Sequence, residues 1–393
     1  MFSGQQKRLL ALDGGGIMGL ISLAMLKRME DQLRPYSGRG PRFVLSDFFD
    51  YFAGTSTGAI IATGLAMGKS VDELIAFYDE AGPAMFKPAR WYQRLWYSYS
   101  EAPLEAKLRA VIGERTILEM IERGDLKRLL MVVTRNADSD SPWPITTNLA
   151  ARYNDPARPD CNLRIPLWQL VRASTAAPTF FRPEIIDFGD KPRAFVDGGI
   201  TPHNNPALLL FKKAVMPHYK LGWPTGENRL MLVSIGTGFT SSAQSVVRME
   251  GRTVLGAARS VPGELMRSIQ QDNDINCRVL GRCVHGPVMD RELGDLIPPQ
   301  PLAYDLGRAF LYARYDADLS AAGLAAQGFP DINPDTLTID NTRAIPDLQR
   351  IGAAAAAAVD LPRHFAPFMG WLANIQGAGP SQLNLNYSMS EQP

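Results

Sequence analysis

The hydrophobic pattern predicts short buried strands that alternate with helices over the first 240 residues. Apolar runs bounded by turn residues are typical of buried strands, and they lie at residues 9–12, 48–53, 129–134, 194–196 and 230–235. Apolar residues with helical spacing lie between them, at residues 20–33, 59–66, 71–78, 104–123 and 167–175. This alternation predicts an α/β fold in which helices cover a mostly parallel sheet.

The second part of the chain has a weaker pattern. Helical spacing returns at residues 263–282 and 349–359, with a proline-rich stretch between them, and residues 139–166 are expected to form a long loop. We therefore expect three parts: an α/β domain at residues 8–240, a C-terminal helical extension packed on it at residues 241–375, and a loose polar tail at residues 376–393.

The amino-acid composition limits the kinds of partner and the cellular compartment to expect. Hydrophobic residues make up 46% of the chain and charged residues 21%, which is ordinary for a globular protein with a large core. The 41 Lys and Arg residues nearly balance the 40 Asp and Glu residues, so no bulk field attracts a nucleic acid polymer. Three cysteines without a C-x-x-C pair, and four histidines, predict neither a disulfide framework nor a metal site. No signal-peptide pattern or membrane-length apolar run is present, so a cytoplasmic protein is expected.

A serine between two glycines follows the second predicted strand. The residues Gly54-Thr55-Ser56-Thr57-Gly58 fit the G-x-S-x-G nucleophile elbow, in which a strained strand-to-helix turn exposes a serine oxygen. A Cβ at Gly54 or Gly58 would collide with the neighbouring strand or helix. The alternative is a turn of small residues that performs no chemistry.

The first predicted strand leads into a second glycine-rich turn. Gly14-Gly15-Gly16-Ile17-Met18-Gly19 fits G-x-G-x-x-G, which also occurs in dinucleotide-binding folds. Those folds place an acidic residue at the end of the second strand to hold the ribose, whereas Glu30 and Asp31 lie inside the first predicted helix. The other use of such a turn is an oxyanion hole, in which the N–H groups of Gly14, Gly15 and Gly16 converge on one point.

For the base that would activate Ser56, Asp197 is a better candidate than any of the four histidines. Asp197 ends an apolar strand, and Gly198 and Gly199 leave space beside its carboxylate. A partly desolvated aspartate can accept the serine proton when N–H donors stabilise the oxyanion. His203 is the one histidine near this motif, and a turn aspartate bonded to its own backbone is the alternative interpretation of Asp197.

Five motifs occur in order along residues 8–240. They are Asp13-Gly14-Gly15-Gly16-Ile17-Met18-Gly19, Gly54-Thr55-Ser56-Thr57-Gly58, Arg172-Ala173-Ser174-Thr175-Ala176-Ala177-Pro178, Asp197-Gly198-Gly199 and Asn204-Asn205-Pro206. Together they resemble the motifs of the patatin-like phospholipases, a family of lipid acyl hydrolases with a Ser–Asp dyad. A bacterial member of that family is expected.

The resemblance implies a three-layer α/β/α fold and a phospholipase A-type enzyme without a metal or organic cofactor. It assigns Ser56 as the nucleophile, Asp197 as the base and Gly14 to Gly16 as the oxyanion loop. The matching motifs also contain Gly19, Gly54, Gly58, Gly198 and Gly199. One residue departs from the family pattern: Met18 stands where the family usually has Arg or Lys.

Regulation and partners stay open at this point. Bacterial members of the family include defence effectors switched on by cyclic nucleotides, so a cyclic nucleotide activator is a hypothesis that no residue here identifies. A homo-oligomer is compatible with the sequence. A non-catalytic nucleotide-binding protein that uses the glycine turn is the alternative function.

Residues Phe86–Ser100 combine aromatic and cationic side chains and contain no acidic residue. This composition suits a lipid–water interface. It also fits a loop whose aromatic rings pack on the domain while its cations stay solvated. We therefore expect a lipid ester substrate and a peripheral membrane contact, which would place the active protein at the inner membrane.

Overall fold

The computed structural model describes residues 6–87, 97–189, 191–239, 254–289, 292, 294–297 and 307–370. Its strands are β1 (Lys7–Leu12), β2 (Tyr51–Thr55), β3 (Leu129–Asn136), β4 (Ser141–Thr146), β5 (Glu184–Asp187), β6 (Pro192–Asp197), β7 (Leu230–Ile235), β8 (Arg282–His285) and β9 (Leu311–Tyr315). Its α-helices are α1 (Gly19–Leu33), α2 (Thr57–Ala66), α3 (Val71–Met85), α4 (Ala102–Ile112), α5 (Ile117–Glu122), α6 (Leu167–Ser174), α7 (Ala207–Val215), α9 (Val254–Leu280), α10 (Ala321–Ala326), α11 (Ile345–Ala356) and α12 (Leu361–His364).

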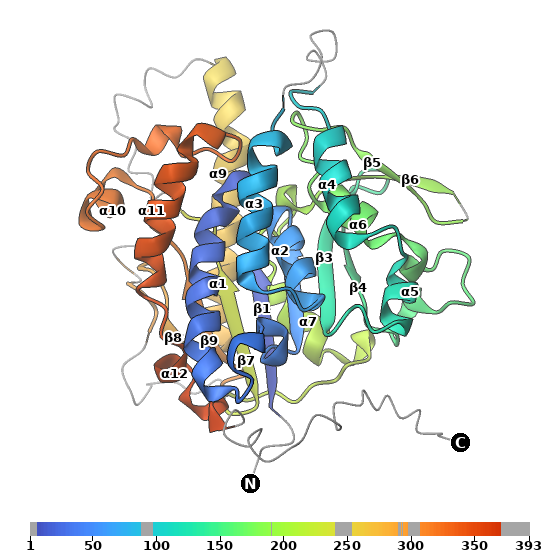
Figure 1. Ribbon diagram of the computed structural model, residues 1–393, viewed down its shortest axis with the longest axis horizontal. Helices are drawn as coiled ribbons and strands as arrows, with labels where there is room; N and C mark the ends of the chain where they lie inside the picture. Colours follow the sequence, from blue (N-terminus) through green and yellow to red (C-terminus); the bar gives the residue numbers. More distant parts are fainter. Residues whose placement is uncertain are drawn as a thin grey trace.

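The strands of the described residues form one nine-stranded, mostly parallel sheet (Figure 1). Hydrogen-bonded neighbours follow the order β5-β6-β3-β2-β1-β7-β9-β8, and β4 also pairs with β3. The pairs formed by β1, β2, β3, β7, β8 and β9 with one another are parallel, whereas β4, β5 and β6 pair antiparallel. The predicted parallel sheet is confirmed, and the carboxyl ends of β1, β2 and β7 lie at the edge where such sheets bind ligands.

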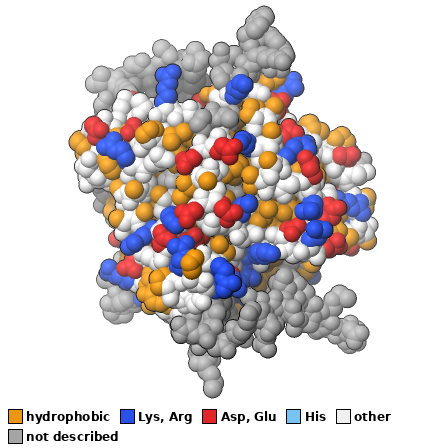
Figure 2. Space-filling model, in the orientation of Figure 1, with side chains coloured by type: hydrophobic (Ala, Val, Ile, Leu, Met, Phe, Trp, Pro, Cys, Tyr) orange, Lys and Arg blue, Asp and Glu red, His pale blue; other side chains and the backbone are white. Residues whose placement is uncertain are grey.

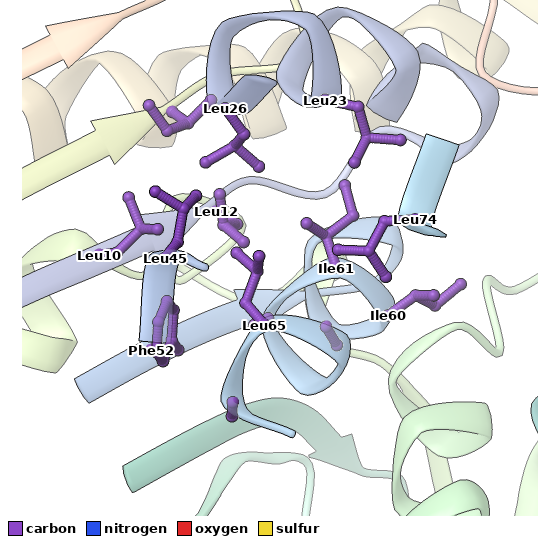
Figure 3. Packing of buried hydrophobic residues seen from close by; sticks show 14 of the residues in the cluster. Leu10, Leu12, Leu23, Leu26, Leu45, Phe52, Ile60, Ile61, Leu65 and Leu74 are labelled. Carbon is purple, nitrogen blue, oxygen red and sulfur yellow. The ribbon is translucent and has the colours of Figure 1, made fainter. Parts of the chain in front are cut away.

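Helices cover both faces of this sheet, because successive side chains of a strand point to opposite faces. In β1, Leu10 and Leu12 belong to the core shared with α1 and α2, while Leu9 and Ala11 belong to the core shared with α7 and α9. Figure 3 shows the first of these cores, where Leu10 and Leu12 face Leu26 of α1 and side chains of α2. The three-layer α/β/α fold is therefore confirmed.

Two predicted elements differ from the structure. The helix expected at residues 104–123 is two helices, because Gly113 ends α4 with a φ of +87° and Thr116 begins α5 with a capping box to Glu119. The loop expected at residues 139–166 contains strand β4, which carries Pro142 and Pro144. Among the described residues β4 pairs only with β3, so an edge position accommodates the missing N–H groups of the prolines.

The C-terminal region is not simply a helical extension. Strand β9 pairs with β7 and strand β8 pairs with β9, so this region continues the central sheet. Helix α11 lies beside α1 (Figure 1), and an added Cβ on Gly352 would lie 2.9 Å from the Cβ of Ala24. The expected tail at residues 376–393 lies outside the described residues, as do residues 88–96 of the Phe86–Ser100 segment.

The surface carries both signs of charge. Figure 2 shows Lys and Arg side chains interspersed with Asp and Glu on one face of the molecule, in line with the formal net charge of +1. In the part of the chain that the structure describes, no helix combines the length and the apolar character needed to cross a bilayer.

Candidate active site

Ser56 occupies a strained turn between β2 and α2. Its φ of 55° and ψ of −124° lie in a region that L-residues rarely adopt. An added Cβ on Gly54 would lie 2.1 Å from the carbonyl oxygen of Gly58, and one on Gly58 would lie 2.3 Å from that of Leu12. Both glycines are therefore needed for the close approach of strand and helix, as the sequence predicts.

The register of the sheet brings Asp197 to this turn. Strand β4 occupies one edge of β3, so β2 and β6 share the other edge. On that edge β2 ends with Thr55 opposite Val133, and the next residue, Thr134, pairs with Asp197 of the antiparallel β6. Two residues 141 positions apart in sequence thereby become neighbours, and the Ser56 Oγ donates a hydrogen bond to Asp197 Oδ2 over 2.6 Å.

The Asp197 carboxylate is buried and has the character of a base that works near neutral pH. Its other oxygen, Oδ1, accepts the backbone N–H of Gly199 at 2.6 Å. Burial raises the pKa of Asp197 to about 6, while the hydrogen bonds from Ser56 and Gly199 and the positive charge of Arg172 act in the opposite direction. At pH 7 the carboxylate is mostly ionised and can accept the proton of the serine.

Ser174 at the end of α6 supports the elbow. Its hydroxyl accepts the backbone N–H of Ser56 at 2.9 Å and donates to the carbonyl of Val133 at 2.7 Å. Two residues further on, the carbonyl of Ala176 accepts the N–H of Asp197 at 3.0 Å. One short segment therefore positions both members of the pair. Ser174 lies in one of the five sequence motifs, but its role could not be predicted, because its spacing from Ser56 carries no signal.

Two further motif glycines allow backbone segments to approach closely. An added Cβ on Gly198 would lie 2.3 Å from the carbonyl oxygen of Val133. One on Gly19 would lie 2.6 Å from the Thr57 Oγ1, where α1 begins beside the start of α2. These contacts explain why a side chain is excluded at both positions.

The glycine-rich turn lies directly beside Ser56, since a Cβ on Gly14 would be 3.1 Å from the Cβ of Ser56. The three glycines differ in one respect that their sequence does not predict: the N–H of Gly14 donates to the carbonyl of Asn204 at 3.2 Å. Within the described part of the chain, the N–H groups of Gly15 and Gly16 donate no backbone hydrogen bond. Two of the three expected donors are therefore available to a ligand.

A loop of the C-terminal region holds the same turn from the other side. The carbonyl of Ile339 accepts the N–H of Ile17 at 2.9 Å. Gly16 has a φ of +57°, and an added Cβ there would lie 2.1 Å from that Ile339 oxygen. Met18, which replaces the cation usual in the family, is buried in the core.

No histidine of the described residues hydrogen-bonds to Ser56. The backbone carbonyl of His203 accepts a bond from Thr55 at 2.7 Å, but its ring Nδ1 is buried without a partner there. Burial and, to a smaller extent, the positive charges of Lys212 and Lys213 lower the pKa of His203 to about 4. The described residues also contain no cluster of three or more His, Cys, Asp or Glu side chains that could hold a metal ion.

Sequence comparison identifies the family to which this arrangement belongs. The family model described as Patatin-like phospholipase matches residues 10–211, which is more than half of the chain and includes both Ser56 and Asp197. The chain belongs to the patatin-like phospholipases. The predicted family is thereby confirmed.

Relatives in this family come from bacteria, animals and plants. The chain is 32% identical over 217 residues to a cGAMP-activated phospholipase of Vibrio cholerae, covering 52% of this chain and 56% of the relative. It is 30% identical to an intracellular phospholipase A2 of Caenorhabditis elegans, covering 58% of this chain and 19% of the relative. It is 27% identical to Patatin-17 of Solanum cardiophyllum, covering 61% of this chain and 62% of the relative. In each case the match spans less than two thirds of the relative's length.

Proposed function

We propose that this patatin-like protein is a lipid acyl hydrolase of phospholipase A type, which cleaves fatty-acyl esters through Ser56 and Asp197. The observation that carries the proposal is the 2.6 Å hydrogen bond from a serine at a nucleophile elbow to a buried carboxylate. A nucleophile needs an adjacent base within hydrogen-bond distance, and this pair meets that requirement without histidine.

The proposed reaction has two steps. Asp197 takes the proton of Ser56 as the Oγ attacks the ester carbonyl carbon, and the N–H groups of Gly15 and Gly16 bind the resulting oxyanion. Asp197 then returns the proton to the leaving alcohol, and an acyl-enzyme remains. In the second step Asp197 takes a proton from water, which attacks the acyl carbonyl carbon. As the ester bond to Ser56 breaks and the fatty acid leaves, Asp197 returns that proton to the Ser56 Oγ. Gly14, whose N–H is bonded to Asn204, shapes the loop.

Nucleotide binding by the glycine turn is the weaker alternative. It explains neither the strained serine nor its bond to Asp197. Acyl transfer accounts for both features together.

Covalent labelling tests the proposal directly. A fluorophosphonate probe should phosphonylate Ser56, as detected by intact mass and peptide mapping. Protein that has not been treated with the probe should release fatty acid from phosphatidylcholine–phosphatidylglycerol vesicles. The probe needs an activated serine, so an inert turn would stay unmodified. An unlabelled Ser56 together with no fatty acid release would overturn the proposal, and tight ADP or NAD binding by calorimetry would favour the alternative.

The raised pKa of Asp197 predicts a distinctive pH dependence. Only the ionised carboxylate can accept the serine proton, so kcat/KM for a soluble ester should fall at least about tenfold per unit well below pH 6. It should reach its plateau above about pH 8, because burial also raises the pKa of the neighbouring Asp13, to about 7. If the base were an exposed aspartate with the ordinary pKa of 3.8, activity would persist to a pH about two units lower. Initial rates from pH 4.5 to 9 measure this limb. A rate that stays flat down to pH 5 would exclude Asp197 as the titrating base.

Membrane contact and nucleotide control are further parts of the proposal. The described ends of the Phe86–Ser100 segment carry aromatic rings packed together, with Phe86 and Tyr99 5.4 Å apart, and co-sedimentation with the same vesicles measures a peripheral contact. Two bacterial relatives are named cGAMP-activated phospholipases. A panel of cyclic dinucleotides added to the vesicle assay tests whether this chain responds. Equal rates with and without them would reject control by a cyclic nucleotide.

A further inference from the structure

A buried ion pair lies beneath the glycine turn and links it to the C-terminal part of the sheet. Asp13 directly follows β1, and Arg314 lies on β9, with β7 between the two strands. The Arg314 side chain crosses β7: its Nη1 donates to Ser234 Oγ at 2.8 Å and to Asp13 Oδ1 at 3.3 Å. Its Nη2 donates to Asp13 Oδ2 at 2.7 Å.

This pair is buried and is fully charged only above about pH 7, because burial raises the pKa of Asp13 to about 7 while Arg314 acts in the opposite direction. Asp13 is 1% exposed and Arg314 is 5% exposed, and a two-pronged Arg–carboxylate contact fixes both side chains in one geometry. Burial alone would lower the pKa of Arg314, but the nearby carboxylates of Asp13, Asp316 and Asp274 raise it above its usual value. The guanidinium therefore stays protonated, and removing it would leave several buried carboxylates without compensation.

Arg314 also holds the turn that follows β7. Its Nη2 donates to Asp316 Oδ2 at 2.5 Å, and Asp316 Oδ1 accepts the N–H of Gly238 at 2.8 Å. From the same turn, Thr237 donates its hydroxyl to the carbonyl of Gly14 at 3.0 Å. The glycine turn is thus held at Asp13 directly and at Gly14 through the neighbouring turn, both dependent on one guanidinium.

We propose that Arg314 is a positioning residue for oxyanion stabilisation, which acts through Asp13 and Asp316 to direct the N–H groups of Gly15 and Gly16 toward Ser56. This inference rests on the proposed acyl hydrolase function. Arg314 lies beyond residues 10–211, where the family model matches. It therefore makes part of the C-terminal region necessary for the chemistry of a site whose recognised motifs all lie before residue 207.

Two variants test this role. Asp13→Asn keeps an oxygen that can accept from Arg314 but removes the charge that Asp13 carries at the assay pH of 8.5. Arg314→Lys keeps the charge but loses the two-pronged geometry. Because an error of about 1 Å in a catalytic group costs up to about 100-fold in rate, kcat for a soluble ester should fall about 10- to 100-fold while KM changes by less than about twofold. Asp347→Asn and Arg350→Lys, which alter an exposed pair 3.3 Å apart, are the matched controls.

The distinguishing measurement is the affinity for a fatty trifluoromethyl ketone, which forms an oxyanion adduct with an active serine. Its affinity should fall by the same factor as kcat/KM, whereas the affinity of the methyl ketone of equal chain length should not change. Rates are expressed per active site titrated with the fluorophosphonate, so a smaller fraction of folded protein does not lower the measured kcat. Unchanged kcat and ketone affinity in Asp13→Asn would overturn the inference even if Arg314→Lys fails to fold. A wild-type chain with neither labelling nor hydrolysis would instead overturn the proposed function, and this inference with it.

Discussion

Ser56→Ala is expected to reduce ester hydrolysis on the order of 10⁴- to 10⁶-fold, because it removes the atom that forms the acyl-enzyme. The residual rate would come from the oxyanion donors and from substrate binding, which act on water as a poor nucleophile. Fluorophosphonate labelling should disappear at the same time. Fatty acid release from vesicles and hydrolysis of a soluble ester should both be lost, because both substrates use the same oxygen.

The fold should survive this substitution. Alanine takes the same backbone angles as serine at this strained position, and the elbow stays held by the bond from the Ser56 N–H to Ser174. The lost Oγ bond to the buried Asp197 carboxylate costs about 1.5–3 kcal/mol in the free energy of unfolding. Ser139→Ala, which alters an exposed surface serine, is the matched control and should retain full activity. More than a few per cent of wild-type activity in Ser56→Ala would assign the chemistry to another nucleophile.

The elbow was predictable from sequence because its requirements are local. The backbone can make a strand-to-helix turn this tight only if glycines stand at positions 54 and 58. An added Cβ at these positions would lie only 2.1 and 2.3 Å from backbone oxygens. The layered sheet was predictable for the same reason, since the apolar runs of β1, β2, β3 and β7 are buried on both faces. Local chemistry and hydrophobic periodicity carry this information.

The partners of Ser56 depend on pairing between distant segments, which leaves no local pattern. Asp197 is brought to the elbow because β6 continues the edge of β3 where β2 ends. The strand end and the two following glycines made Asp197 a candidate base, but only the resemblance to a family paired it with Ser56. Ser174 and the engaged N–H of Gly14 are likewise products of tertiary contact. None of these follows from periodicity.

Strand β9 was missed for a different physical reason. Arg314, the fourth of its five residues, breaks the apolar run that marks a buried strand. The charge is tolerated because Asp13 and Asp316 stand within 2.7 Å of the guanidinium nitrogens. A buried ion pair therefore hides a strand from any hydrophobic pattern, since each partner alone resembles a surface residue.

Asp197→Asn is expected to reduce kcat/KM on the order of 10⁴-fold, since an amide has the shape of the carboxylate but does not accept a proton. The oxygen that accepts the Gly199 N–H can remain, and the amide NH₂ would face Ser56, so the hydroxyl would become the acceptor of their bond. The limb of the pH profile near 6 should vanish from any residual activity, because the titrating group is gone.

Stability should change in the opposite sense to activity. Burial raises the pKa of Asp197 from 3.8 to about 6 in the folded chain, so the ionised carboxylate destabilises the fold at every pH above this range. Asp197→Asn removes that cost, and its midpoint of thermal unfolding at pH 8 should equal or exceed that of wild type. Asp187→Asn, on the exposed end of β5, is the matched control and should change neither quantity. An Asp197→Asn variant that stays active would transfer the role of base to another group, whereas a stable but inactive one would show that a buried charge is kept here for chemistry at the expense of stability.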